Sequence, residues 1–154
     1  MRIEVKSAKE LSLYEKARQE CVVISSLYAY LTGTKWAEAD WTVMVWEDVE
    51  LVSNIHIIER TAQVGGQPIR LGGIGNVATK VEWRKHGYAT EALKTAMAFL
   101  NDPLKVDFGL MIATEKMIFG YEKRGWKVVA QSMLIDQPVG KKDFKIPVMV
   151  LPVL

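Results

Sequence analysis

A short segment near the middle of the chain combines an apolar strand, a basic turn and a helix start with small residues. It reads Val77-Ala-Thr-Lys-Val-Glu-Trp-Arg-Lys-His-Gly-Tyr-Ala-Thr90. A helix start has unbonded backbone N–H groups and a positive dipole end, and both favour an anionic phosphate. Gly87 allows a ligand to approach the main chain, and the small Ala89 leaves room beside it. Arg84 and Lys85 add positive charge, so the pattern predicts a phosphate-binding turn.

This turn resembles the signature of the GNAT superfamily of acyl-CoA-dependent N-acetyltransferases. That signature is Gln/Arg-x-x-Gly-x-Gly/Ala at a strand–helix junction, and Arg84, Gly87 and Ala89 match it. A second segment, Phe119-Gly-Tyr-Glu-Lys-Arg-Gly-Trp126, is similar to the family's Leu-Tyr-Glu-Lys-x-Gly-Phe. With the order of the surrounding strands and helices, the resemblance covers roughly residues 40–151.

The resemblance implies acetyl-CoA as co-substrate and direct transfer of its acetyl group to an amine in a ternary complex. Tyr121 would be the general acid that protonates the departing thiolate, and an ordinary phenol pKa of ~10 keeps it protonated at neutral pH. The alternative for Tyr121 is a core-packing residue. The backbone of Val77 and Thr79 would pair with the pantetheine arm like an added strand. The residues expected around the pyrophosphate are Arg84, Lys85, His86, Gly87, Tyr88, Ala89 and Thr90.

Within the superfamily the chain is most similar to aminoglycoside 2′-N-acetyltransferases. This closer resemblance rests on three segments, Val77-Ala78 followed by Trp83-Arg84, Arg124-Gly-Trp126 and Val150-Leu-Pro152. Those enzymes carry a glutamate two residues before the Val-Ala pair, where this chain has Gly75. A polycationic sugar favours carboxylates around it, so intact aminoglycosides are not expected to be the main acceptors.

An amine attacks a thioester only when neutral, so a group must take its proton. The strand at residues 69–80 contains no Asp or Glu. His56 has a suitable intrinsic pKa near ~6.5, but a lone histidine in an apolar strand is more often a hydrogen-bonded core residue. We assign no base, because a solvent water serves equally well. The side chains considered are Asp40, Glu47, His56, Asn76 and Glu82.

The surrounding pattern predicts one α/β (α+β) domain over residues 1–154, with a mixed, mostly antiparallel central sheet flanked by helices. The expected strands are residues 2–6, 42–46, 51–58, 69–80, 106–113, 128–135 and 144–150, with a turn at Gly65-Gly66 and a polar loop at 136–142. Four helices are expected. The first begins after Ser7, has Glu10 as capping-box partner and has an apolar face of Leu11, Leu13, Tyr14, Ala17, Cys21 and Val22. The others are Ser25–Leu31, closed by Gly33, then Tyr88–Leu100, and then Glu115–Lys123, ended by Gly125.

Composition limits the class of protein. The 154 residues are 49% hydrophobic and 25% charged, with a net charge of +2, which argues against disorder and against a strongly basic nucleic-acid binder. Cys21 is the single cysteine, and the start of the chain has no signal-peptide core, so we expect a cytoplasmic protein. The sequence contains no apolar run of ~18 residues, so we expect no membrane-spanning segment.

The expected partner is a small-molecule or peptide amine, and we expect no nucleic acid, membrane or metal partner. The sequence does not decide between a monomer and a homodimer. Two other functions also stay open. One is a non-catalytic acyl-CoA-binding module on the same fold, since the usual carboxylate is missing from the strand at 69–80. The other is a small α/β interaction protein whose glycine turn binds nothing.

Overall fold

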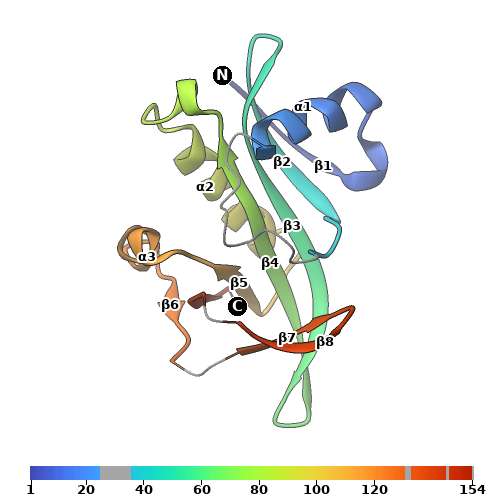
Figure 1. Ribbon diagram of the computed structural model, residues 1–154, viewed down its shortest axis with the longest axis vertical. Helices are drawn as coiled ribbons and strands as arrows, with labels where there is room; N and C mark the ends of the chain where they lie inside the picture. The colour runs from blue at the N-terminus through green and yellow to red at the C-terminus, as the bar shows by residue number, and fades with distance from the viewer. Residues whose placement is uncertain (25–35, 131–132, 145, 154) are drawn as a thin grey trace.

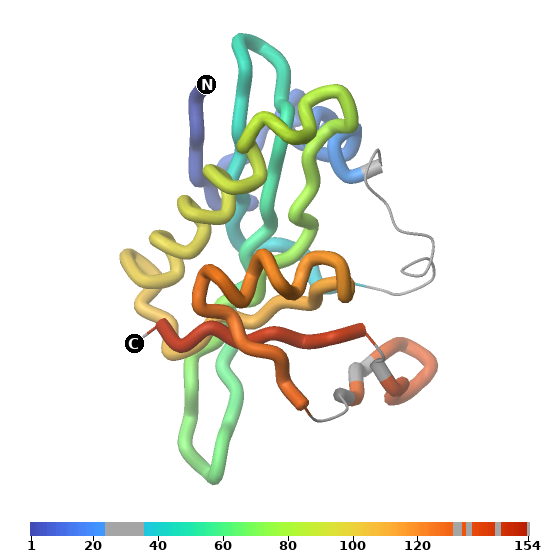
Figure 2. Tube along the Cα trace, turned by 90° about the vertical axis from the view of Figure 1, so that its left-hand side faces the viewer, coloured from blue at the N-terminus to red at the C-terminus, as the bar shows by residue number. Residues whose placement is uncertain are grey.

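The chain forms a large sheet with helices on both faces, as the computed structural model shows (Figures 1 and 2). The structure describes residues 1–24, 36–130, 133–144 and 146–153. The strands of the main sheet are β1 (Arg2–Ser7), β2 (Trp41–Glu47), β3 (Glu50–Val64), β4 (Gln67–Thr79), β5 (Phe108–Ile112), β6 (Lys127–Val128) and β9 (Val148–Pro152). The helices are α1 (Leu13–Ile24), α2 (Tyr88–Asn101) and α3 (Glu115–Glu122), and β7 (Met133–Gln137) pairs with β8 (Gly140–Phe144) in a separate hairpin.

The predicted fold class is confirmed, because the sheet is mixed and mostly antiparallel. Its strand order is β1-β2-β3-β4-β5-β9-β6, and in the described residues β4 and β5 form the parallel pair. They pair only as far as Ile74, opposite Met111. β4 continues to Thr79 beyond this pairing. On the side of β4 that faces β5, the described part of the chain therefore has no strand paired with residues 75–79. At ~3.3 Å per residue this open edge is about 16 Å long.

A β-bulge interrupts the pairing of β3 with β4 where the open edge begins. His56 pairs with Gly75, but Ile55 lies opposite two residues, Asn76 and Val77. Asn76 has a φ of 46°, a left-handed conformation that asparagine tolerates better than most residues. A bulge bends its strand and changes the direction of nearby side chains. The end of β4 therefore departs from regular pairing before it reaches the basic turn.

Helix α2 covers one face of the sheet and forms most of the main core with it. Its buried residues recur at helical spacing, as the sequence predicts; they are Ala92, Leu93, Ala96 and Leu100. Leu100 packs so closely on β4 that a Cβ added at Gly72 would lie 2.3 Å from its Cδ2 atom. Full burial of a leucine stabilises a fold by about 1.5–3 kcal/mol. This packing fixes α2 against β4 and so limits the geometry of the turn that joins them.

Helix α1 lies on the opposite face, and its predicted start after Ser7 is wrong. Residues 8–10 form a short 3₁₀ turn, in which the Ser7 N–H donates to the Glu10 carboxylate at 3.1 Å. The α-helix has its own cap, because the Ser12 N–H donates to Glu15 at 2.8 Å and the Glu15 N–H donates to the Ser12 hydroxyl at 3.1 Å. Both pairs have capping-box spacing, and only the second begins a full helix.

The predicted apolar face of α1 is also wrong in part. Leu13 is 85% exposed, Tyr14 is 49% exposed and Cys21 is exposed. Val22 is fully buried in a small core with residues of β2 and β3. Because the helix starts later than predicted, a different set of its side chains faces the sheet, and the polar residues Glu15 and Gln19 are buried there. Their partners are on β1 and β2, which local sequence periodicity does not reveal.

The two predicted closing strands at residues 128–135 and 144–150 are each divided. Residues 127–128 form β6, which pairs with β9 in the main sheet. Residues 133–137 and 140–144 form the β7–β8 hairpin, so most of the predicted loop at 136–142 is strand. Pairing between distant segments decides this arrangement, and the apolar pattern alone joined segments that belong to different sheets.

One predicted element, the helix at Ser25–Leu31 with its closing residue Gly33, lies outside the described residues. Within the described part of the chain, no helix is long and apolar enough to cross a membrane. The same residues contain no group of three or more His, Cys, Asp or Glu side chains placed to hold a metal ion.

Candidate functional site

The turn between β4 and α2 has a left-handed backbone at two residues. Lys85 has a φ of 65°, and Gly87, the N-cap of α2, has a φ of 86°. Glycine adopts this left-handed conformation without the steric cost that a Cβ adds. No side chain caps the start of α2, so its first N–H groups remain directed at the turn. The residues lining a hollow here are Thr79, Trp83, Arg84, Lys85, Gly87, Tyr88, Ala89 and Thr90.

Side chains on both sides hold this turn in place. The Tyr88 hydroxyl donates to Glu47 on β2 at 3.0 Å, and the Tyr88 ring meets the Trp83 ring edge-on with centroids 5.8 Å apart. Burial, and then the hydrogen bond to the Glu47 carboxylate, raise the pKa of Tyr88 above its usual value. The phenol is therefore engaged with β2, and the contribution of Tyr88 to the hollow is its backbone at the first turn of α2.

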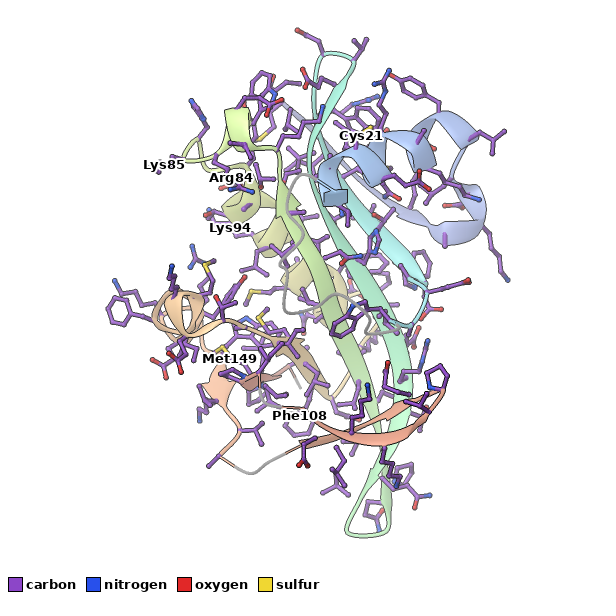
Figure 3. All side chains as sticks on the ribbon, in the orientation of Figure 1. Cys21, Arg84, Lys85, Lys94, Phe108 and Met149 are labelled. Carbon is purple, nitrogen blue, oxygen red and sulfur yellow. The ribbon has the colours of Figure 1, made fainter. Side chains whose placement is uncertain are left out.

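Positive charge gathers beside the turn. Arg84, Lys85 and Lys94 lie on the same side of the molecule, near the start of α2 (Figure 3). Lys94 is paired with Glu91 one helical turn away, at 2.8 Å. Arg84, Lys85 and His86 are exposed. Arg84 and Lys85 therefore supply positive charge beside the turn that can reach an anion at the start of α2.

The open edge of β4 leads from the bulge to the turn. The Lys80 N–H donates to Val52 on β3 at 3.0 Å, so the preceding Thr79 carbonyl faces the other way, toward the open edge. Alternation places the Val77 backbone on the same edge. The Arg84 Nε donates to the Thr79 carbonyl at 3.1 Å, a contact that the sequence did not reveal. Thr79 thus links the open edge to the turn through Arg84.

The second predicted motif lies on α3, which follows β5, the parallel neighbour of β4. Tyr121 is 8% exposed and packs with the main core near the C-terminal end of α3. Arg124 donates from Nη1 to the Gly120 carbonyl at 2.7 Å, and its Nη2 lies 3.5 Å from the Thr90 hydroxyl on α2. The structure therefore brings the end of α3 to the start of α2, as a single site built from both motifs requires.

The side chains considered for the amine's proton are separated by the structure. Asp40 directly precedes β2, and its carboxylate accepts from the Glu59 N–H and from the Arg60 guanidinium on β3. Glu47 is bound to Tyr88 and to the N-terminal amine. Glu82 is exposed. Of these residues, the ones placed at the bulge are His56 and Asn76.

His56 and Asn76 contact each other across the bulge. The Asn76 amide nitrogen lies 2.9 Å from His56 Nδ1, and burial lowers the pKa of His56. Two further polar residues, which the sequence did not predict, lie nearby, Asn54 on β3 and Thr42 on β2. Asn54 is fully buried and donates to the Asn76 carbonyl at 3.2 Å, and Thr42, the register partner of His56, accepts a bond from Gln19 at 2.6 Å. Nothing in their local sequence marks them, because each bond joins separate elements.

Comparisons with known proteins identify the family and the fold of this chain. The family model described as an acetyltransferase (GNAT) domain matches residues 13–129. An acyl-CoA N-acyltransferase from Pseudomonas aeruginosa superposes with a TM-score of 0.70 at 17% identity, covering 99% of both chains. ElaA from Escherichia coli superposes at 0.68 with 13% identity, covering 98% of this chain and 99% of the other. FeeM, an N-acyl amino acid synthase from uncultured soil microbes, superposes with a TM-score of 0.69 at 12% identity, covering 99% of this chain and 91% of the other. No curated protein sequence matches.

Proposed function

Because the chain belongs to the GNAT acetyltransferase family and is an N-acyltransferase by that membership, we propose that it transfers an acetyl group from acetyl-CoA to a primary amine. Transfer is direct, within a ternary complex of enzyme, acetyl-CoA and amine. The observation that carries the proposal is the left-handed turn at Lys85 and Gly87, which opens the start of α2 at one end of the open β4 edge.

The residues present fit acetyl-CoA. The backbone N–H groups from Lys85 to Thr90 suit a pyrophosphate, with Arg84 adding charge beside them. The open edge of β4 suits the amide-containing pantetheine arm, which can accept and donate backbone-type hydrogen bonds at Val77. The Thr79 carbonyl accepts from the Arg84 Nε at 3.1 Å, which ties the end of this edge to the turn that would hold the pyrophosphate.

The chemistry that acetyl-CoA supplies is an activated thioester carbonyl. In the transfer a nitrogen–carbon bond forms, the carbon–sulfur bond breaks, and the amine loses one proton. Tyr121 would give its phenol proton to the departing sulfur, as general acid. Solvent water would take the proton from the amine. The start of α2 would orient the donor. The contact of Arg124 with Thr90 supports a site in which the end of α3, with Tyr121, lies beside the start of α2.

Initial rates of thiol release test this proposal when acetyl-CoA and an amine are varied together. Direct transfer predicts intersecting double-reciprocal lines, and release that requires the amine. Parallel lines would indicate a covalent acetyl-enzyme and contradict the ternary complex. Tight CoA binding without turnover on any amine of a broad panel would contradict catalysis and leave an acyl-CoA-binding module.

A further inference from the structure

The contact between His56 and Asn76 fixes which ring nitrogen carries the proton. The Asn76 Nδ2 atom lies 2.9 Å from His56 Nδ1. An amide nitrogen donates hydrogen bonds and does not accept them, so Nδ1 must be the acceptor. In a neutral imidazole the other nitrogen then carries the hydrogen. His56 is therefore held with its proton on Nε2.

The surroundings of His56 favour this neutral form. Burial lowers the pKa of His56, and no charged group contributes to that shift among the described residues. A protonated ring would also direct an Nδ1–H at the N–H of the Asn76 amide, which is repulsive. To act as a base, His56 would have to accept a proton at the nitrogen that Asn76 already occupies. The geometry thus gives the ring a donor at Nε2 and leaves it without a vacant basic nitrogen.

Gly75 leaves room beside His56 on the neighbouring strand. His56 and Gly75 are direct cross-strand partners, so their Cβ positions lie on the same face of the sheet, ~5 Å apart. A Cβ added at Gly75 would meet no heavy atom within 4 Å. Gly75 is also the first residue of the open β4 edge, at the end away from the phosphate turn. The space beside His56 therefore adjoins the inner end of the edge that suits the pantetheine arm.

We propose that neutral His56 binds the acceptor, donating a hydrogen bond from Nε2 to an oxygen atom close to the amine nitrogen. The acceptor occupies the space over Gly75. The assignment rests on the proposed acetyl transfer and names its substrate class, a small primary amine that carries a hydroxyl or carbonyl oxygen. The polar groups bonded to His56 and at the bulge, Asn76 and Asn54, are uncharged, which suits a neutral oxygen. His56 is a substrate-binding residue here and not the general base.

The tautomer can be measured without any substrate. The chain has two histidines, so a His86→Gln variant leaves His56 as the one ring in a long-range ¹H–¹⁵N spectrum. We expect the Nε2–H tautomer, neutral at pH 7. Asn76→Asp should reverse the bond, because a carboxylate can only accept; the proton then moves to Nδ1 and the pKa of His56 rises. An Nδ1–H tautomer in the protein with Asn76 intact would overturn the proposal.

Kinetics test the role in substrate binding. The amine panel contains 2-aminoethanol and glycinamide, with propylamine as the analogue that lacks oxygen. His56→Ala should raise the KM for the oxygen-bearing amines about tenfold, change kcat less than threefold and leave the KM for propylamine unchanged. His56→Gln, which keeps a donor near the Nε2 position, should stay within about threefold of the unsubstituted protein.

Two results would contradict the binding role. One is a panel in which propylamine is as good an acceptor as the oxygen-bearing amines. The other is a large loss of kcat in both variants together with loss of the acidic limb of the pH profile, which would make His56 the base. CoA affinity, measured by calorimetry in the same variants, separates this outcome from a failure of the proposed function. No CoA binding by any form would overturn the acetyl transfer and leave the tautomer result standing.

Discussion

The Nη2 atom of Arg124 lies 3.5 Å from the Oγ1 atom of Thr90, and this contact joins two segments that are 34 residues apart in the sequence. Thr90 belongs to the first turn of α2, and Arg124 follows α3. The same guanidinium donates to the Gly120 carbonyl at 2.7 Å. One side chain therefore couples the position of the proposed general acid to the proposed phosphate site.

Replacing Arg124 with Gln should weaken CoA binding about three- to tenfold, because the start of α2 loses its contact with α3. Stability should change little, since the side chain is exposed and the lost bonds contribute on the order of 1 kcal/mol. Lys123→Gln is the matched control, because it removes the same charge one residue away, where Lys123 lies over the Phe119 ring. Calorimetry on both variants measures the difference. Equal losses of affinity would show that charge alone matters.

Gly87→Val should reduce CoA affinity more than tenfold. At a φ of 86° a β-branched side chain is strained, so the turn must change its backbone before it can bind a pyrophosphate. The control is Gly66→Val, at a φ of 79° in the β3–β4 turn, which imposes similar strain far from α2. The control should lose a comparable amount of stability and keep its CoA affinity. A folded Gly87→Val protein with normal affinity would place the cofactor elsewhere.

Tyr121→Phe removes only a hydroxyl and keeps the buried ring. We expect turnover to fall about 100-fold, the low end for loss of one proton donor, with CoA affinity within a few-fold and little change in melting temperature. Tyr14→Phe is the control, since its hydroxyl donates to the Val49 carbonyl on the surface at 3.0 Å. Thermal melting and steady-state thiol release are measured on both. A Tyr121→Phe protein that melts earlier but turns over normally would make Tyr121 a packing residue.

The stability of α1 should depend on pH through Glu15. Hydrogen bonds from Lys6 and from the Ser12 N–H hold the pKa of Glu15 below its usual value of 4.5. A carboxyl with a lowered folded pKa stabilises the fold above pH 4.5 and loses that contribution as the pH falls through the folded pKa. Glu15→Gln should therefore lower the melting temperature by a few degrees at pH 7, with the difference disappearing in acid.

Glu20→Gln, on the exposed side of the same helix, should show no such difference at any pH. Melting curves between pH 2 and pH 7 give the comparison, where the lower limit lies below the ordinary carboxyl range. A Glu15→Gln deficit that persists unchanged in acid would mean that packing, and not the ionised carboxylate, explains the loss.

Local sequence patterns, formed by residues close together in the chain, predicted much of this fold. The turn at Gly65-Gly66, the helical stripe of α2 and the basic strand–helix junction are local patterns, and the structure has all three. The start of α1 was ambiguous because two Ser-x-x-Glu pairs, at Ser7 and Ser12, lie five residues apart. Only packing against the sheet distinguishes them.

The contacts within the candidate site were not predictable from the sequence. The bond between His56 and Asn76 depends on a bulge that shifts the register of two strands, and its partners are 20 residues apart. The bond from Arg84 to the Thr79 carbonyl depends on how the turn folds back on β4. Residue types indicated the reaction class, whereas tautomer, orientation and the space over Gly75 are properties of the folded chain.

The most direct test of acetyl transfer measures both products of one reaction. Purified protein is incubated with acetyl-CoA, with and without the amine panel, and free CoA and acetylated amine are quantified together by mass spectrometry. Direct acetyl transfer predicts equal amounts of the two products, formed only when an amine is present. CoA release at the same rate without amine, and no acetylated amine, would contradict it.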